Sequence, residues 1–126
     1  MNDQCAPILV VDDEPEMCWI FENIIRKAGF TGMKALSAME ANALTESNEF
    51  GMVFLDAKLP DVDGLELARK LRKTYAHLPI VIVSGFFNSD DPAIVGALQT
   101  GLIIAFVGKP FDNDEIVSVI SRCASK

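Results

Sequence analysis

Five short apolar runs recur along this chain, and a segment of different periodicity separates each run from the next. Four of the runs are nearly continuous stretches of Val, Ile, Leu, Met and Phe, whereas the fifth is weaker. Unbroken apolar runs of this length are typical of strands that are covered on both faces, as in a parallel sheet. The strong runs are residues 8–11, 52–55, 80–83 and 102–107, and the weaker one is residues 31–36.

The segments between the runs carry helical patterns. Apolar residues recur at three- and four-residue steps from Met17 to Ala28, and Gly29 then ends the pattern. Pro92 after Asp91 marks another helix start, and three further starts have the spacing of a capping box. These three pairs are Ser37 with Glu40, Asp63 with Glu66, and Asp112 with Glu115.

Strands that alternate with helices in this way predict a doubly wound α/β sandwich with a five-stranded parallel sheet, because parallel strands need right-handed crossovers. The 126 residues fit one domain, and half of them are hydrophobic. A net charge of −7 makes the domain a poor candidate for direct nucleic-acid binding. Cys5, Cys18 and Cys123 are far apart and His77 is the only histidine, so the sequence predicts reduced thiols rather than a zinc site.

Polar residues stand at the carboxyl ends of the expected strands, where doubly wound sheets bind their ligands. Asp12 and Asp13 follow the first strand, Asp56 ends the third, Ser84 the fourth and Lys109 the fifth. Each residue alone has an ordinary interpretation, such as a helix cap, a turn residue or a surface charge. Their convergence at one edge of the sheet is much harder to attribute to turn chemistry.

Three clustered carboxylates repel each other unless a cation lies among them. Oxygen-only ligands suit a hard divalent ion, most naturally Mg²⁺, which tends to bridge to phosphate. Lys109 would supply a second positive charge, and the Ser84 hydroxyl can donate a hydrogen bond to a phosphoryl oxygen. Asp56 is then placed to act as a carboxylate nucleophile that forms an aspartyl-phosphate.

Four motifs carry these residues, namely VVDDE at 10–14, FLDAKLPDVDG at 54–64, IVSG at 82–85 and GKPF at 108–111. In this order and spacing the chain resembles the receiver domains of two-component response regulators over essentially its whole length. The resemblance implies a flavodoxin-like (βα)5 fold with strand order 2-1-3-4-5. We therefore expect a single receiver domain over residues 1–126, with no output domain in this chain, which would be either a stand-alone regulator or a fragment of a larger one. The reduced thiols predict a cytoplasmic location.

The resemblance also implies roles for the acidic residues. Asp56 would be the phosphoacceptor. Asp12, Asp13, Asp56 and the backbone carbonyl of Lys58 would bind Mg²⁺. The only reactions that the domain would catalyse are its own phosphorylation and dephosphorylation, so we do not expect an enzyme in the ordinary sense.

Three further residues take roles from the resemblance. Lys109 would pair with the phosphoryl group, and its peptide bond to Pro110 is often cis in the family. Ser84 would move toward the phosphoryl group and Phe106 would follow, which remodels the face formed by the fourth helix, the fifth strand and the fifth helix. Phe106 stands where a tyrosine is frequent.

The expected partners follow from the same resemblance. They are a sensor histidine kinase or phosphotransfer protein, and a downstream protein or output domain, with a phosphorylation-dependent dimer as a further option. No membrane and no direct nucleic-acid contact is expected. Two residues, Phe86 and Phe87, could form a partner surface, partly cover the site or belong to the core.

Three alternative classes share features of this sequence. A haloacid-dehalogenase-like phosphatase needs a second aspartate two residues after the nucleophile, where this chain has Lys58. A flavodoxin-like electron carrier needs a hydroxyl- and glycine-rich phosphate loop after the first strand, where Asp13, Glu14 and Pro15 would repel phosphate. The main alternative is a phosphorylation-independent pseudo-receiver that acts as a protein-interaction module, although such domains usually lack part of the acidic set.

Overall fold

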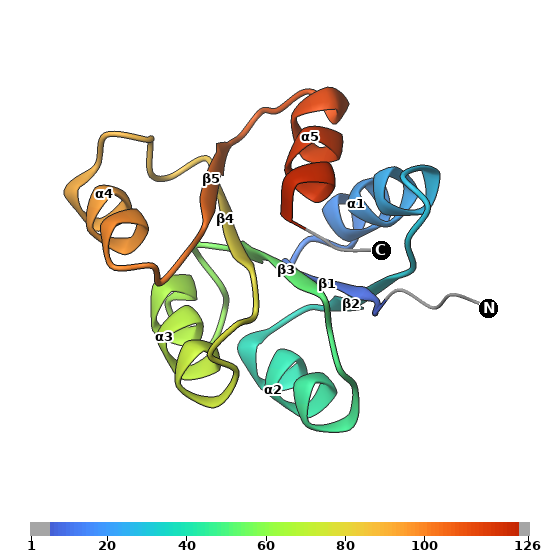
Figure 1. The fold of residues 1–126 in the computed structure, drawn as a ribbon, viewed down its shortest axis with the longest axis horizontal. Helices are drawn as coiled ribbons and strands as arrows, with labels where there is room; N and C mark the ends of the chain where they lie inside the picture. Colours follow the sequence, from blue (N-terminus) through green and yellow to red (C-terminus); the bar gives the residue numbers. More distant parts are fainter. Residues whose placement is uncertain (1–5, 124–126) are drawn as a thin grey trace.

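The computed structural model describes residues 6–123, and within this range five strands and five helices alternate along the chain (Figure 1). The strands are β1 (Ile8–Val11), β2 (Gly32–Ala35), β3 (Met52–Asp56), β4 (Ile80–Ser84) and β5 (Ala105–Gly108). The helices are α1 (Pro15–Lys27), α2 (Ala38–Ser47), α3 (Gly64–Thr74), α4 (Pro92–Gln99) and α5 (Asn113–Cys123). None of these helices has the length and apolar character needed to cross a bilayer.

All strands pair in parallel, in the order β2-β1-β3-β4-β5. Helices α1 and α5 cover one face of the sheet, and α2, α3 and α4 cover the other (Figure 1). Successive side chains of a strand point to opposite faces, so a strand covered on both faces contributes to two cores. Leu9 and Val11 pack on the side of α2 to α4, whereas Ile8 and Val10 pack on the side of α1 and α5. The predicted fold and strand order are confirmed.

The helix boundaries follow from local side-chain chemistry. Ser37 Oγ accepts a hydrogen bond of 3.1 Å from the amide of Glu40, and Asp63 accepts one of 2.8 Å from Leu65 at the start of α3. Both bonds satisfy a backbone donor that has no partner within the helix. After α1, Gly29 adopts a φ of 94°, a conformation that favours glycine.

The fifth strand is shorter than the predicted run of residues 102–107. It spans Ala105–Gly108, because the chain first turns at Gly101, whose φ is 80°. The amide of Ile103 then bonds to the carbonyl of Ala97, at 3.2 Å, which ties this segment to α4. Ile103 is nevertheless fully buried, so its apolar character reports burial rather than membership of the strand.

The two cysteines within the described range are free thiols, and Cys5 lies outside that range. Cys18 is buried in α1, and its thiol donates a hydrogen bond to the carbonyl of Asp12 at 3.3 Å. Burial, with the nearby charge of Asp12, raises the pKa of Cys18 to about 11. This thiol therefore remains protonated and packs as a small apolar group.

Candidate functional site

The sheet order places the carboxyl ends of β1, β3, β4 and β5 side by side. In the strand register, Asp56 lies opposite Val83, and the next residue, Ser84, lies opposite Gly108, which precedes Lys109. The five residues singled out from the sequence therefore meet at one edge of the sheet, as predicted.

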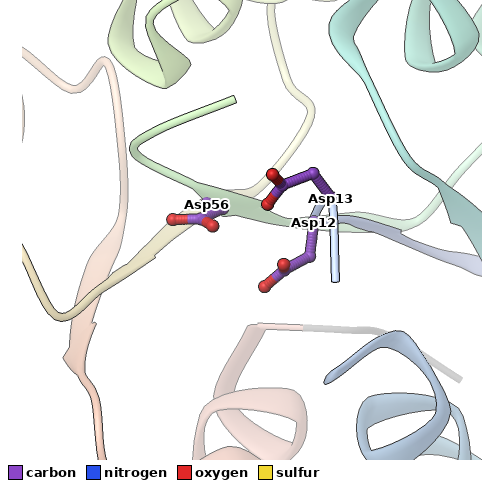
Figure 2. Close-up of side chains that lie close together, drawn as sticks. All are labelled: Asp12, Asp13 and Asp56. Atoms are coloured by element: carbon purple, nitrogen blue, oxygen red, sulfur yellow. The ribbon is translucent and has the colours of Figure 1, made fainter. Parts of the chain in front are cut away.

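Three carboxylates form the acidic part of this site. Asp12 and Asp13 leave the end of β1, Asp56 ends β3, and all three side chains project toward the same side of the strand ends (Figure 2). One oxygen from each carboxylate lies within 4.8 Å of the others. Asp12 is buried and Asp13 is exposed, so the group opens to solvent on one side. Clustered hard oxygen donors with an open side fit a Mg²⁺ ion, which keeps several of its waters.

Lys109 lies against two of the three carboxylates. Its Nζ atom is 3.1 Å from Oδ2 of Asp12 and 3.6 Å from Oδ2 of Asp56. Burial alone would lower the pKa of Lys109, but the hydrogen bond and charge of Asp12, with the charges of Asp56 and Glu14, outweigh it and raise that pKa. Lys109 is therefore a fixed positive charge beside the predicted nucleophile.

Asp56 is a half-buried carboxylate. Burial raises the pKa of Asp56, and the opposing effect of Lys109 offsets this only in part, while the charge of Asp12 adds to the increase. The ionised form of Asp56 is thus costly in the metal-free protein, and any additional positive charge at the site would lower that cost. The only backbone contact to its carboxylate among the described residues is a long hydrogen bond, 3.3 Å, from the amide of Lys58 to Oδ1.

Ser84 is buried at the end of β4 and organises the loop that follows. Its Oγ atom accepts hydrogen bonds from the amides of Phe86, at 2.8 Å, and Phe87, at 3.1 Å. A hydroxyl has two acceptor lone pairs and one proton, so these two bonds leave the O–H itself to act as a donor.

The predicted switch residue, Phe106, lies on β5 opposite Ile82 of β4. Its side chain is partly buried and packs against the core on the side of α2 to α4. The Lys109–Pro110 peptide bond is cis, as the resemblance implies.

The structure separates the two phenylalanines that the sequence left undecided. Phe86 is exposed, with 64% of its surface accessible, whereas Phe87 is partly buried against the core. The Nζ atom of Lys58 lies over the ring of Phe86, 4.3 Å from its centroid. Sequence reasoning did not find this contact, because the two residues belong to different loops.

Gly64 is a second residue whose role the sequence reasoning missed. A Cβ atom at this position would lie 2.2 Å from the backbone oxygen of Asp56 and 2.8 Å from Cα of Ala57. The amide of Gly64 also donates to the carbonyl of Ala57 at 2.8 Å. The start of α3 therefore packs directly on the backbone that presents Asp56. The Asp-Gly pair at 63–64 was the available signal.

Asp61 is the third such residue. Its two carboxylate oxygens accept hydrogen bonds from the amides of Ala38, at 3.0 Å, and Met39, at 2.9 Å. These bonds lower the pKa of Asp61, the one from Ala38 contributing most. They attach the loop after β3 to the first turn of α2, and no sequence pattern indicates a contact across more than 20 residues.

Comparisons with known proteins identify the family to which the sequence is similar. Residues 8–121 match the family model described as the response regulator receiver domain. The DNA-binding transcriptional regulator NtrC of Salmonella typhimurium is 31% identical over 118 residues, which are 94% of this chain and 24% of that protein. The C4-dicarboxylate transport transcriptional regulatory protein DctD of Rhizobium meliloti is 33% identical over 119 residues, 94% of this chain and 25% of that protein.

Among solved structures, a CheY-like response regulator receiver domain protein from Methanospirillum hungatei JF-1 superposes with a TM-score of 0.86 at 24% identity, covering 94% of this chain and 93% of that one. The chain spans about a quarter of the length of the two curated relatives. NtrC is named as a DNA-binding protein, so the names of the relatives do not support the expectation of no direct nucleic-acid binding.

Proposed function

Because the chain belongs to the family of response regulator receiver domains, we propose that it accepts a phosphoryl group on Asp56 from a sensor histidine kinase or a phosphotransfer protein. The observation that carries this proposal is the group of three carboxylates at the edge of the sheet, in which the ammonium of Lys109 lies against both Asp12 and Asp56. Phosphoryl transfer to a carboxylate depends on positive charge that stabilises the phosphoryl oxygens, which Lys109 and a cation among the carboxylates would supply.

Asp12, Asp13, Asp56 and the backbone carbonyl of Lys58 would hold Mg²⁺ in this proposal. The fit rests on the oxygen-only donors of the three carboxylates, which lie within 4.8 Å of each other. When bound, the ion would neutralise charge on the phosphoryl oxygens.

Three residues of the chain would each have a separate role in the phosphoryl transfer. A carboxylate oxygen of Asp56 forms a bond to phosphorus, while the bond between phosphorus and the donor's imidazole nitrogen breaks and its electron pair stays on that nitrogen. The Lys109 ammonium is within 3.6 Å of Asp56, so it can pair with a phosphoryl oxygen attached there. The Ser84 hydroxyl would donate its proton in a hydrogen bond to another phosphoryl oxygen.

The signal would leave the site through Ser84. Its Oγ atom accepts hydrogen bonds from the amides of Phe86 and Phe87, so a movement of this hydroxyl toward the phosphoryl group would disturb the loop before α4. Phe106 would bury its ring in the space that Ser84 vacates. The face made by α4, β5 and α5 would change as a result, and a downstream protein, an output domain or a second receiver would bind there.

A phosphorylation-independent pseudo-receiver remains the alternative function. The complete set of Asp12, Asp13, Asp56, Ser84 and Lys109 supports the phosphoacceptor, because an interaction module has no need to keep three carboxylates in mutual repulsion. The relatives are about four times as long as the region that they share with this chain. We therefore propose that any DNA binding belongs to a further domain outside this region, which is compatible with the acidic charge of the receiver. A cytoplasmic location is proposed because the chain belongs to the receiver-domain family.

The decisive experiment is phosphorylation by a small donor. Incubation with acetyl phosphate and Mg²⁺ should add the mass of one phosphoryl group, measured on the intact protein by mass spectrometry. Asp56→Asn should abolish the addition, because an amide is a poor nucleophile toward phosphorus. Asp90→Asn, at an exposed loop position, serves as the matched control and should be labelled like the wild type. Undiminished labelling of Asp56→Asn would refute the assignment, and no labelling of the wild type would favour the pseudo-receiver.

A further inference from the structure

The charge at the acidic site is balanced for a divalent cation. With the three carboxylates ionised, the three negative charges and the one ammonium of Lys109 leave a formal charge of −2. A second ammonium among the carboxylates would reduce this charge to −1 and would compete with a metal ion for the same oxygens.

Lys58 is the lysine that could supply such an ammonium. Its amide already donates to Oδ1 of Asp56, and its exposed side chain is a flexible four-carbon stem. Within residues 6–123, however, the ammonium of Lys58 forms no ion pair with a carboxylate. It lies instead over the ring of Phe86, 4.3 Å from the centroid, as in a cation–π contact.

Two contacts position Phe86, one through its backbone amide and one through its ring. Its backbone amide, like that of Phe87, donates to Oγ of Ser84. Phe87 meets the ring edge-on, with centroids 5.0 Å apart and an angle of 76°, and Phe87 itself packs against the core. Lys58 and Phe86 then line the same shallow cavity of about 250 Å³ beside the site. The exposed ring of Phe86 therefore lies beside the site, in contact with both Phe87 and the ammonium of Lys58.

We propose that Phe86 is a positioning residue for the metal site, because it holds the ammonium of Lys58 away from the three carboxylates. The proposal rests on the Mg²⁺ site proposed above and adds a determinant of its affinity. Without an aromatic ring at position 86, the ammonium of Lys58 would spend more time on Asp56 and Asp13 and would weaken Mg²⁺ binding by competition.

Mg²⁺ affinity, measured by calorimetric titration with MgCl₂ in the absence of a phosphoryl donor, tests this directly. Phe86→Leu keeps an apolar side chain but removes the ring, and we expect it to bind Mg²⁺ roughly two- to fivefold more weakly than the wild type, the effect of one exposed ion pair. Phe86→Tyr keeps the ring and should retain the wild-type affinity. In a Lys58→Met background, Phe86→Leu should have no further effect on affinity.

The last comparison separates a role through Lys58 from a general change in the loop. If the double variant binds Mg²⁺ more weakly than Lys58→Met, Phe86 acts on the loop and the proposal is wrong. Equal affinities of Phe86→Leu and the wild type would also overturn it while leaving the metal site intact. A wild-type protein that does not bind Mg²⁺ at all would remove the metal site itself, and this inference with it.

Discussion

The ammonium of Lys109 lies 3.1 Å from a carboxylate oxygen of Asp12, although 97 positions separate the two residues in the chain. The contact joins the loop after β5 to the loop after β1, across the intervening ends of β3 and β4. The same ammonium is 3.6 Å from Asp56, so one cation balances part of the negative charge of two carboxylates, those of buried Asp12 and half-buried Asp56. Removing the ammonium of Lys109 should therefore change both the stability of the protein and its response to a metal ion.

Lys109→Met should lower the free energy of unfolding by about 1 to 3 kcal/mol in EDTA, because it leaves two carboxylates without a counter-charge in a partly buried site. The increase in melting temperature on addition of Mg²⁺ should be larger in this variant than in the wild type, since the formal charge of the site becomes −3 when three carboxylates lose their one ammonium. Urea titrations and thermal melts measure both. Lys73→Met, at an exposed position of α3, should change stability by less than about 0.5 kcal/mol. Equal stability of the two variants would contradict the argument.

Asp56→Asn should stabilise the metal-free protein. The pKa of Asp56 is raised by burial, so the folded state holds the proton more tightly than the unfolded state, and ionisation at neutral pH costs stability. We expect a melting temperature roughly 2 to 6 °C above that of the wild type in EDTA at pH 7, equivalent to about 1 kcal/mol. The difference should shrink as the pH falls through the raised folded-state pKa, and it should vanish well below the unfolded-state pKa of about 3.9, where the wild-type carboxyl is protonated in both states. A variant less stable than the wild type at pH 7 would show that the contact with Lys109 outweighs burial.

Two glycine substitutions should have opposite effects. Gly64→Ala would place Cβ 2.2 Å from the backbone oxygen of Asp56, so either α3 or the loop must move, at a cost of about 1 to 3 kcal/mol or more. In Gly96→Ala the new atom meets nothing within 4 Å, and the change should stabilise α4 by about 0.5 to 1 kcal/mol. Urea titration gives both values. The acetyl phosphate reaction should slow only in Gly64→Ala, and normal phosphorylation of this variant would show that Asp56 tolerates the displacement.

Acid should weaken the contact between Asp61 and α2. Because hydrogen bonds from Ala38 and Met39 lower the pKa of Asp61, its ionised form is favoured in the folded state. The stability that it contributes is therefore complete above the unfolded-state pKa of about 3.9 and is lost as the pH falls through the lower folded-state value. Wild type and Asp61→Asn should differ in melting temperature at pH 6, and this difference should disappear once the pH lies below the lowered folded-state pKa of Asp61. A constant difference across this range would mean that the carboxylate charge plays no part.

The proposed switch predicts which part of the domain changes its conformation on phosphorylation. A complex with beryllofluoride and Mg²⁺ should shift backbone amide resonances between Ser84 and Phe106 more than those of α1 and α2. The amides of Phe86 and Phe87 should be among the most affected, since both bond to Oγ of Ser84. Shifts confined to the loops around Asp56 would indicate a phosphoacceptor that does not signal through this face.

The sequence was sufficient for the fold because its apolar runs and helix caps agree with each other. Unbroken runs such as residues 8–11 are needed where helices cover both faces of a sheet, and Asp63 and Ser37 cap the helices that they were predicted to start. The fifth strand was misplaced at its beginning, because Ile103 is buried in the segment between α4 and β5 and the apolar pattern does not separate burial from strand pairing.

The convergence of the site was predictable for a topological reason, since parallel strands present their carboxyl ends together. The supporting contacts were not predictable, because they depend on where loops meet in space. Asp61 reaches α2 from the loop after β3, and Lys58 meets Phe86 from another loop. Neither contact has a characteristic spacing, and the close approach of Gly64 to Asp56 is visible only once the backbone is built.

That close approach has a practical meaning for anyone who redesigns such a domain. The backbone oxygen of Asp56 and the first residue of α3 occupy adjoining space with no room for a side chain between them. A graft of the acidic strand end into another α/β scaffold must therefore include residues 56–64 as one unit, together with a helix that starts at the same place. Position 64 must stay glycine in any mutational library for the carboxylate to keep its place.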